Sequence, residues 1–325
     1  MARPELGSIA GLLVVFLFFA FMAGSSGFLS TLGTVNYLEV SAQIGIIAVA
    51  VGLLMIGGEF DLSVGSMLGA AGIVVALLVH GEYGKAPLWL AIMLGFAFAL
   101  LIGYINGWLV MVTGLPSFIV TLATLFILRG ASLGFTKLIT NLTIVSGLEE
   151  YTAKNPLTGL FTGKLLGLPA SVWWWVGLTA VFSVLLNSTR FGNWVFSAGG
   201  DANAARNVGV PVRRVKITLF MLTAACATLV AVIQVLGANS ADVLRGQGME
   251  LNAVAAAVIG GCLLTGGYGS VIGASVGALV LGMVQQGIIY TSIDSDWFQV
   301  LVGGMILGAV ILNNYLRKRS LLARR

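Results

Sequence analysis

The chain alternates long apolar runs with short breaks that are polar or rich in glycine. A helix of about 20 apolar residues crosses the roughly 30 Å hydrocarbon core of a membrane. Most of the runs approach that length, so the pattern predicts an all-α, polytopic membrane protein of about ten transmembrane helices. The runs are 8–24, 40–57, 62–80, 87–110, 117–135, 171–187, 215–236, 252–264, 270–290 and 296–315.

One of these runs, 252–264, is shorter than a full crossing and has two glycine pairs towards its C-terminal end. The pairs are Gly260-Gly261 and Gly266-Gly267. Glycine interrupts helices, and interrupted backbone is tolerated at membrane depth where protein or a cavity surrounds it. The sequence therefore predicts a broken or partly re-entrant helix here.

Lysine and arginine gather beside some of the breaks and are scarce beside others. With the N-terminus inside, eleven of the 17 fall in cytoplasmic segments, and the remaining six, Arg129 among them, do not. Cytoplasmic loops carry an excess of these residues. We therefore expect both termini in the cytoplasm, a periplasmic loop at 136–170 and a cytoplasmic loop at 188–214, all within one transmembrane domain, 1–325.

Composition supports the same class of protein. Hydrophobic residues make up 58% of the chain and charged residues only 9%, whereas soluble domains are about 25% charged. The 44 glycines predict close helix packing, because small residues let membrane helices approach one another. The net charge of +5 comes from clusters at the ends of apolar runs, so it indicates topology and excludes nucleic acid as a partner.

The chain has few side chains suited to metal binding or catalysis. His80 is the single histidine, so a histidine metal cluster is excluded, and we expect no metal and no cofactor on this chain. Cys226 and Cys262 lie in apolar runs, where cysteine behaves as a small hydrophobe. The pattern GxxxxGK[ST] is absent, so we expect no ATP bound in the P-loop manner.

The predicted cytoplasmic loop reads GGDANAARNVGVPVRRVK from Gly199. Asp201 is suited to cap a short helix at 203–208, Gly209 to end it in a left-handed conformation, and Pro211 to open the next span. Such a helix is either a docking element for a cytoplasmic partner or an ordinary connection.

Polar and aromatic side chains also occur inside the apolar runs. They either line a path for a polar solute or hydrogen-bond between helices. The candidates for the path are Asn106, Trp108, Phe118, Thr121, Thr124, Gln234, Gln285 and Gln286. Asp61 and Ser63 are expected to cap a helix or to have another structural role, with direct binding of a solute as the alternative for Asp61. The run Trp173-Trp174-Trp175 is expected to anchor a helix at the lipid interface rather than to touch a ligand.

An internal echo links the two halves of the chain. Ile56-Gly57-Gly58, followed by Gly65-Ser66, resembles Ile259-Gly260-Gly261, followed by Gly269-Ser270. Both copies begin at the end of an even-numbered apolar run, which is typical of parallel repeats in transporters.

Four stretches resemble the ribose-type permease family of ATP-binding-cassette (ABC) importers. They are the loop above, GGEFDLSVGS from Gly57, PSFIVTLATLFILRG from Pro116, and ELNAVAAAVIGGCLLTGGYGSVIGASVGALVLG from Glu250. The family usually has GGIDLSVGS, and Glu59-Phe60 replaces its single apolar residue. The resemblance implies that the loop couples to an ATPase, through Gly200, Asp201, Asn203, Ala204, Ala205, Arg206, Val208 and Gly209.

The resemblance also implies a function. It is that of the permease subunit of a binding-protein-dependent, ATP-driven importer of a monosaccharide or polyol, in the bacterial inner membrane. Its implied partners are a second permease subunit, identical or related, a cytoplasmic ABC ATPase that binds ATP and Mg²⁺, and a periplasmic sugar-binding protein. The chain itself performs no enzymatic reaction. The alternative is a self-contained secondary carrier coupled to an ion gradient.

Overall fold

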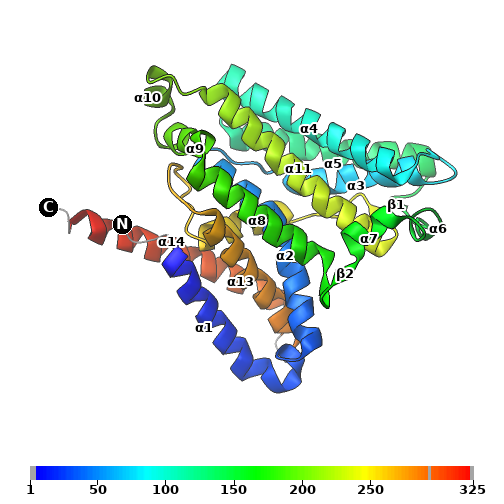
Figure 1. Ribbon diagram of the computed structural model, residues 1–325, viewed down its shortest axis with the longest axis horizontal. Helices are drawn as coiled ribbons and strands as arrows, with labels where there is room; N and C mark the ends of the chain where they lie inside the picture. The colour runs from blue at the N-terminus through cyan, green and yellow to red at the C-terminus, as the bar shows by residue number, and fades with distance from the viewer. Residues whose placement is uncertain (1–4, 292–293, 323–325) are drawn as a thin grey trace. The chain divides into compact units, whose positions relative to one another are not determined.

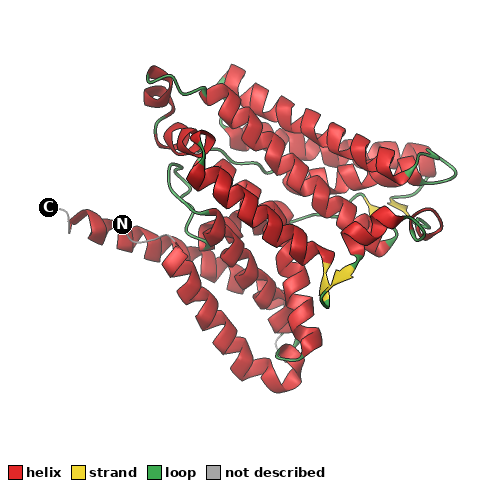
Figure 2. Ribbon diagram, viewed as in Figure 1, coloured by secondary structure: helices red, strands yellow, loops and turns green. Residues whose placement is uncertain are grey.

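The computed structural model describes residues 5–291 and 294–322, and nearly all of the ordered elements are helices (Figure 1, Figure 2). The helices of eleven or more residues are α1 (Glu5–Ala23), α2 (Thr31–Ile56), α3 (Val64–Val79), α4 (Leu88–Thr113), α5 (Ser117–Thr140), α8 (Ala170–Ser188), α9 (Arg190–Gly200), α11 (Val212–Ala238), α12 (Met249–Ile259), α13 (Val271–Ile289) and α14 (Phe298–Leu322). A π-helical turn (Gly24–Phe28) follows α1, and a 3₁₀ turn (Ser295–Trp297) precedes α14.

The remaining elements are short. They are α6 (Glu149–Thr152), α7 (Pro156–Thr162), α10 (Ala202–Asn207), and the strands β1 (Ile144–Val145), β2 (Lys164–Leu165), β3 (Leu168–Pro169) and β4 (Ala241–Asp242). The strands form two antiparallel pairs, β1 with β4 and β2 with β3. Figure 2 shows these strands in yellow among the red helices.

The ten predicted apolar runs all correspond to helices. Among the described residues, seven helical segments are long and apolar enough to cross a membrane, and α3, α12 and residues 298–311 of α14 are shorter apolar helices. The prediction of an all-α polytopic membrane protein is confirmed.

The chain packs as two compact units, each assembled from separate stretches of sequence. Unit 1 comprises the described residues of Met1–Gly58, Trp174–Ala205 and Asn252–Arg325, and unit 2 comprises Glu59–Trp173 and Arg206–Leu251. The expectation that 1–325 forms one transmembrane domain stays a prediction.

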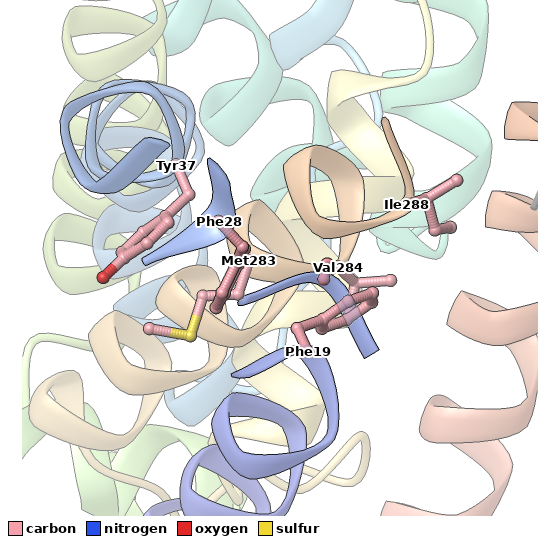
Figure 3. Packing of buried hydrophobic residues seen from close by; sticks show 7 residues of the cluster. Phe19, Phe28, Tyr37, Met283, Val284 and Ile288 are labelled. Atoms are coloured by element: carbon pink, nitrogen blue, oxygen red, sulfur yellow. The ribbon is translucent and has the colours of Figure 1, made fainter. Parts of the chain in front are cut away.

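In unit 1, α13 packs along α2 and α1. Figure 3 shows the buried cluster that joins them, in which Phe19 of α1 and Phe28 meet Tyr37 of α2 and Met283 and Val284 of α13. The rings of Phe28 and Tyr37 stack with centroids 5.2 Å apart. Burial of these large side chains fixes the three helices against one another.

In unit 2, α11 packs against α3 and α4, and α3 also packs against α5. At one end of the unit, a second buried cluster joins α3 and α11 to the strands β1 and β4. It contains Ile73, Ala76, Val145, Leu148, Val235, Ala241 and Val243. The loop after α5 is therefore tied to the helical core by a short sheet and by apolar packing.

Helix α2 begins at Thr31, nine residues before the predicted start of its apolar run at 40. Polar residues in this first part of the helix interrupt the apolar pattern, so the predicted run began too late. The Ser30 hydroxyl caps α2 by accepting a hydrogen bond from the Gly33 amide at 3.0 Å, and the Asn36 side chain donates to the Tyr290 hydroxyl at 3.1 Å. The predicted start was wrong because a polar side chain that finds a partner in the protein can lie on a membrane helix.

The predicted loop 136–170 also needs correction at its start. Helix α5 continues to Thr140 and ends at Asn141, which has a left-handed φ of 58°. Thr136 is fully buried, and the Thr140 hydroxyl donates to its carbonyl at 2.8 Å. The polar residues taken for loop therefore extend the helix, and the ordered elements α6, α7 and β1 to β3 fill the remainder.

The broken helix is confirmed, because α12 has 11 residues and ends at Ile259. At 1.5 Å per residue it spans about 16 Å, half a hydrocarbon core. The echo is confirmed locally. In both copies the second glycine has a positive φ, 81° at Gly58 and 92° at Gly261. The later equivalence is wrong, since Gly65-Ser66 lies inside α3 whereas Ser270 caps α13.

Candidate functional site: the loop around α10 and the buried segment 59–63

The helix predicted in the cytoplasmic loop is present as α10. The Asp201 carboxylate accepts hydrogen bonds from the amides of Asn203, at 2.9 Å, and Ala204, at 3.0 Å. Gly209 has a φ of 85°, and its amide donates to the Arg206 carbonyl at 3.0 Å. Both ends of α10 are therefore closed as the sequence predicted, by a carboxylate cap and a left-handed glycine.

Most of the residues assigned to coupling are exposed. Ala205 is the buried member of the set, at 3% exposure, while Val208 is 80% exposed. The exposed members are Gly200, Asp201, Asn203, Ala204, Arg206, Val208 and Gly209. A single exposed apolar side chain is normal on a protein surface, so the docking role of these residues stays a prediction.

Helix α9, which precedes α10, was not predicted. It follows a Thr189 cap and reaches Gly199 at its last turn. There it joins a group that we name the glycine junction: Gly58, Gly199, Gly266 and Gly267, together with the Ile56 carbonyl. The Gly267 amide donates to this carbonyl at 2.8 Å.

The glycine junction requires glycine at its centre. A Cβ on Gly199 would overlap the Ile56 carbonyl oxygen and lie 2.8 Å from the Gly267 nitrogen. No real side chain tolerates such contacts with backbone atoms, so only glycine allows this approach. Within unit 1, α9 is thus held directly against the end of α2.

On the other side of α10, helix α11 carries a buried ion pair. Lys216, in the second turn of α11, donates to the carboxylate of Glu59. The two side chains are 10% and 12% exposed. A carboxylate at membrane depth is costly unless it is paired, so the pair explains how unit 2 accommodates Glu59, the residue that departs from the family pattern.

Residues 59–63 are a non-helical segment whose backbone is bonded by neighbouring side chains. The Phe60 amide donates to the Ser117 hydroxyl at 3.0 Å, and the Leu62 amide donates to the Thr121 hydroxyl at 3.1 Å. Irregular backbone inside a membrane is tolerated only when its polar groups are satisfied by the protein. Side chains at the start of α5 meet that requirement.

Asp61 does not cap α3 in the way the sequence suggested. The N-cap position belongs to Ser63. The Asp61 carboxylate, 1% exposed, accepts bonds from the Ser63 amide at 2.9 Å and hydroxyl at 2.6 Å, and from the Thr223 hydroxyl of α11 at 2.6 Å. The hydrogen bond from Thr223 of α11 holds the Asp61 carboxylate in the turn before α3. Asp61 therefore does not occupy the N-cap position.

Three of the path candidates are brought together in this network. The Asn106 amide nitrogen donates to the Ser63 hydroxyl at 3.1 Å, and its oxygen accepts from the Thr124 hydroxyl at 2.6 Å. Thr121 holds the Leu62 amide. Hydrogen bonds within unit 2 therefore account for all three, in line with the interhelical alternative. That these three residues also line a path for a solute stays a prediction.

The other candidates lie apart from this network. Trp108 and Phe118 are 38% and 52% exposed, and Gln234, Gln285 and Gln286 are half-buried. Gln285 and Gln286 lie in unit 1, and Gln234 lies in unit 2. Their assignment to a path stays a prediction.

Two expectations about special side chains have different outcomes. Cys226 and Cys262 are buried, at 4% and 2% exposure, as expected for small hydrophobes. Trp175 does not anchor α8 at a lipid interface, since it is 7% exposed and its ring packs on Gly45 of α2. Because Gly45 has no side chain, the indole of Trp175 fits against α2. This packing outweighs the interfacial preference of tryptophan.

The sequence reasoning missed a pair of opposite charges within unit 2. Arg129 is the thirteenth of the 24 residues of α5 and lies inside the predicted run 117–135. Its guanidinium lies 4.0 Å from the carboxylate of Glu250. An arginine inside an apolar run is itself a signal, because such residues are rare and have partners.

The loop that leads to Glu250 is held by Arg245. This guanidinium donates to the carbonyls of Ser240, at 2.5 Å, and Gln234, at 3.2 Å. Burial lowers the pKa of Arg245, and the nearby Asp242 carboxylate opposes that shift. The ordinary pKa of an arginine side chain, from which this shift starts, lies far above neutrality.

Comparisons with known proteins place the chain in a family. Residues 33–310 match the family described as "Branched-chain amino acid transport system / permease component". The chain belongs to this permease family. It is a transport permease and a multi-pass protein of the bacterial inner membrane. No solved structure was found to match it.

Several curated relatives cover nearly the whole chain. The probable ABC transporter permease protein YphD of Escherichia coli K12 is 35% identical over 97% of this chain and 92% of its own length. The ribose import permease protein RbsC of Bacillus subtilis is 33% identical over 97% and 94%. The xylose/arabinose import permease protein XylH of Sulfolobus acidocaldarius is 31% identical over 94% and 84%. The expected resemblance to ABC permeases is therefore confirmed.

Proposed function

We propose that this chain is the permease subunit of an ATP-driven importer that takes a monosaccharide or polyol into the cell. The observation that carries the proposal is α10, a short helix with closed ends and an exposed surface. In the proposal, a cytoplasmic ATPase binds this helix. ATP and Mg²⁺ belong to that partner, and this chain contributes no covalent chemistry.

The attachments on either side of α10 suggest how force passes into the membrane. Before α10, α9 contacts Gly58 through the glycine junction. After α10, Lys216 of α11 binds Glu59. Gly58 and Glu59 are neighbours in the chain, so their Cα atoms are about 3.8 Å apart. If the ATPase moved α10, α9 would therefore act on Gly58 and α11 would act on Glu59, at the start of segment 59–63.

The relatives support the substrate class and the partners. Ribose and xylose or arabinose appear in the names of two import permeases that cover most of this chain. By analogy, a periplasmic sugar-binding protein delivers the sugar, and a second permease subunit, identical or related, completes the path.

Reconstitution tests the proposed function against an ion-coupled carrier. The permease, its ATPase and its sugar-binding protein are assembled in proteoliposomes, and uptake of labelled D-ribose, D-xylose, L-arabinose and myo-inositol is measured singly. We expect accumulation of at least one of them that requires ATP and both partners. Uphill uptake by the isolated chain under a proton or sodium gradient would contradict the proposal.

A further inference from the structure

A charged side chain lies at the middle of a membrane-spanning helix in unit 2. Arg129 has twelve residues of α5 before it and eleven after it, and its side chain is 27% exposed. Isolated charges are expensive at this depth, so those that occur are paired and mark solute or ion pathways.

The partner of Arg129 is incompletely satisfied. Glu250, at the start of α12, is 8% exposed. Its Oε1 atom lies 4.0 Å from Nη2 of Arg129, which is longer than a direct hydrogen bond. Its Oε2 atom is buried and has no hydrogen-bond partner among the described residues. A buried carboxylate oxygen without a donor is costly, so this unpartnered acceptor calls for an explanation.

The neighbouring backbone leaves space for this carboxylate. A Cβ on Gly65 of α3 would overlap Oε2 of Glu250 and lie 2.6 Å from the Gly246 carbonyl oxygen. The carboxylate therefore faces the first turn of α3, with Arg129 on another helix. It shares no hydrogen bond with the network of segment 59–63.

We propose that Arg129 and Glu250 bind the hydroxyl groups of a neutral polyhydroxylated solute during transport. A hydroxyl oxygen placed about 2.8 Å from each charged atom, an ordinary hydrogen-bond length, closes a triangle on the 4.0 Å separation of the pair. That hydroxyl donates to the carboxylate and accepts from the guanidinium, so the separation of the two charged atoms suits one bridging hydroxyl.

This site rests on the proposed function and names its substrate chemistry. A purely structural pair is the competing account, because opposite charges neutralise each other and a carboxylate is favourable at a helix N-terminus. Water offers the same hydroxyl chemistry as a sugar. The experiments therefore separate accessibility, protection by sugar, and stability.

The first experiment labels cysteines in the complete importer in nanodiscs. The Arg129→Cys variant is treated with a charged, water-soluble methanethiosulfonate reagent, with and without each of the four sugars above. We expect labelling that at least one sugar slows. Lys137→Cys, also on α5 and exposed, is the matched control and should be labelled at a rate that no sugar changes.

Two outcomes overturn the site. If the reagent does not label position 129, the side chain does not face water, and the pair is structural. If labelling occurs but none of the four sugars slows it, the pair binds water only. Uptake of the same four sugars by the wild-type importer, measured in parallel, separates this failure from that of the proposed function: uptake without protection overturns the site alone, whereas absence of all uptake contradicts the proposed function.

The second experiment removes charge and keeps shape. Glu250→Gln should lower the initial rate of sugar uptake about 10-fold, as expected for loss of a hydrogen bond to a charged group. Its melting temperature and its ATP hydrolysis in the complex should stay close to those of wild type. Glu82→Gln, in an exposed turn, should leave uptake unchanged. Normal uptake by Glu250→Gln, or a loss that follows melting temperature, would contradict the site.

Discussion

At the scale of single residues, Glu59 and Lys216 depend on each other. Both side chains are nearly buried, and each removes the cost of leaving the other charged and alone. Breaking such a pair from one side is far more harmful than replacing both partners, because only the single change leaves an unpaired buried charge.

We expect Lys216→Met to lower the free energy of unfolding by about 3 kcal/mol. The double variant Glu59→Gln with Lys216→Met should regain most of that loss, because no buried charge is left unpaired. Thermal melting of the purified protein in detergent measures both. Lys164→Met, at an exposed position, is the control and should melt like wild type. Additive losses in the double variant would show that the pair does not couple.

Residues whose role is local were predictable, and residues with distant partners were not. Asp201 bonds amides two and three residues away, and Gly209 adopts its own backbone conformation, so the sequence around them was sufficient. Asn106 finds Ser63 at a separation of 43 residues, and Asp61 finds Thr223 at a separation of 162. Such partners depend on tertiary packing, which no local pattern encodes.

At the scale of elements, hydrophobic runs located the membrane helices well and their polar ends poorly. Helix α2 starts early because Asn36 has a partner on the facing segment. Helix α9 was missed because its residues are too polar and too few for a span, and its packing depends on the glycine junction. The broken helix α12 was found because glycine pairs interrupt helices whatever surrounds them.

The exposed face of α10 should be sensitive to charge. Arg206→Glu is expected to cut ATP-dependent uptake about tenfold, because reversing a charge at a docking surface repels the partner. Membrane insertion should be unaffected, since the whole of α10 lies outside the apolar runs. Uptake and protein level in isolated membranes are the measurements.

Arg190→Glu is the matched control for this change, because it reverses an exposed arginine of the same loop outside α10. It should retain wild-type uptake. Equal losses for both variants would indicate a general effect of loop charge and would remove the support for docking at α10.

At the scale of the whole molecule, orientation in the membrane is the property that the sequence addresses most directly. Charge counting assigns the region of α6 and α7 to the outside and α10 to the cytoplasm. Each native cysteine is buried, so introduced cysteines report on a low background.

A cysteine at Lys154 should react with an impermeant maleimide added to intact cells, whereas a cysteine at Asn203 should react only after the membrane is opened. Lys154 is exposed, and it is preferable to Asn155, whose side chain caps α7 through the Leu157 amide at 3.0 Å. The opposite pattern of labelling would reverse the orientation.

The glycine junction has a consequence for how the protein can be tuned. Contacts between side chains absorb small displacements by rotating about their χ bonds. Gly199 meets the carbonyl of Ile56 through main-chain atoms alone, and peptide planes are stiff. Side-chain rotation cannot absorb a shift of α9 at this contact, so in the proposed importer such a shift would pass directly to the backbone at the end of α2.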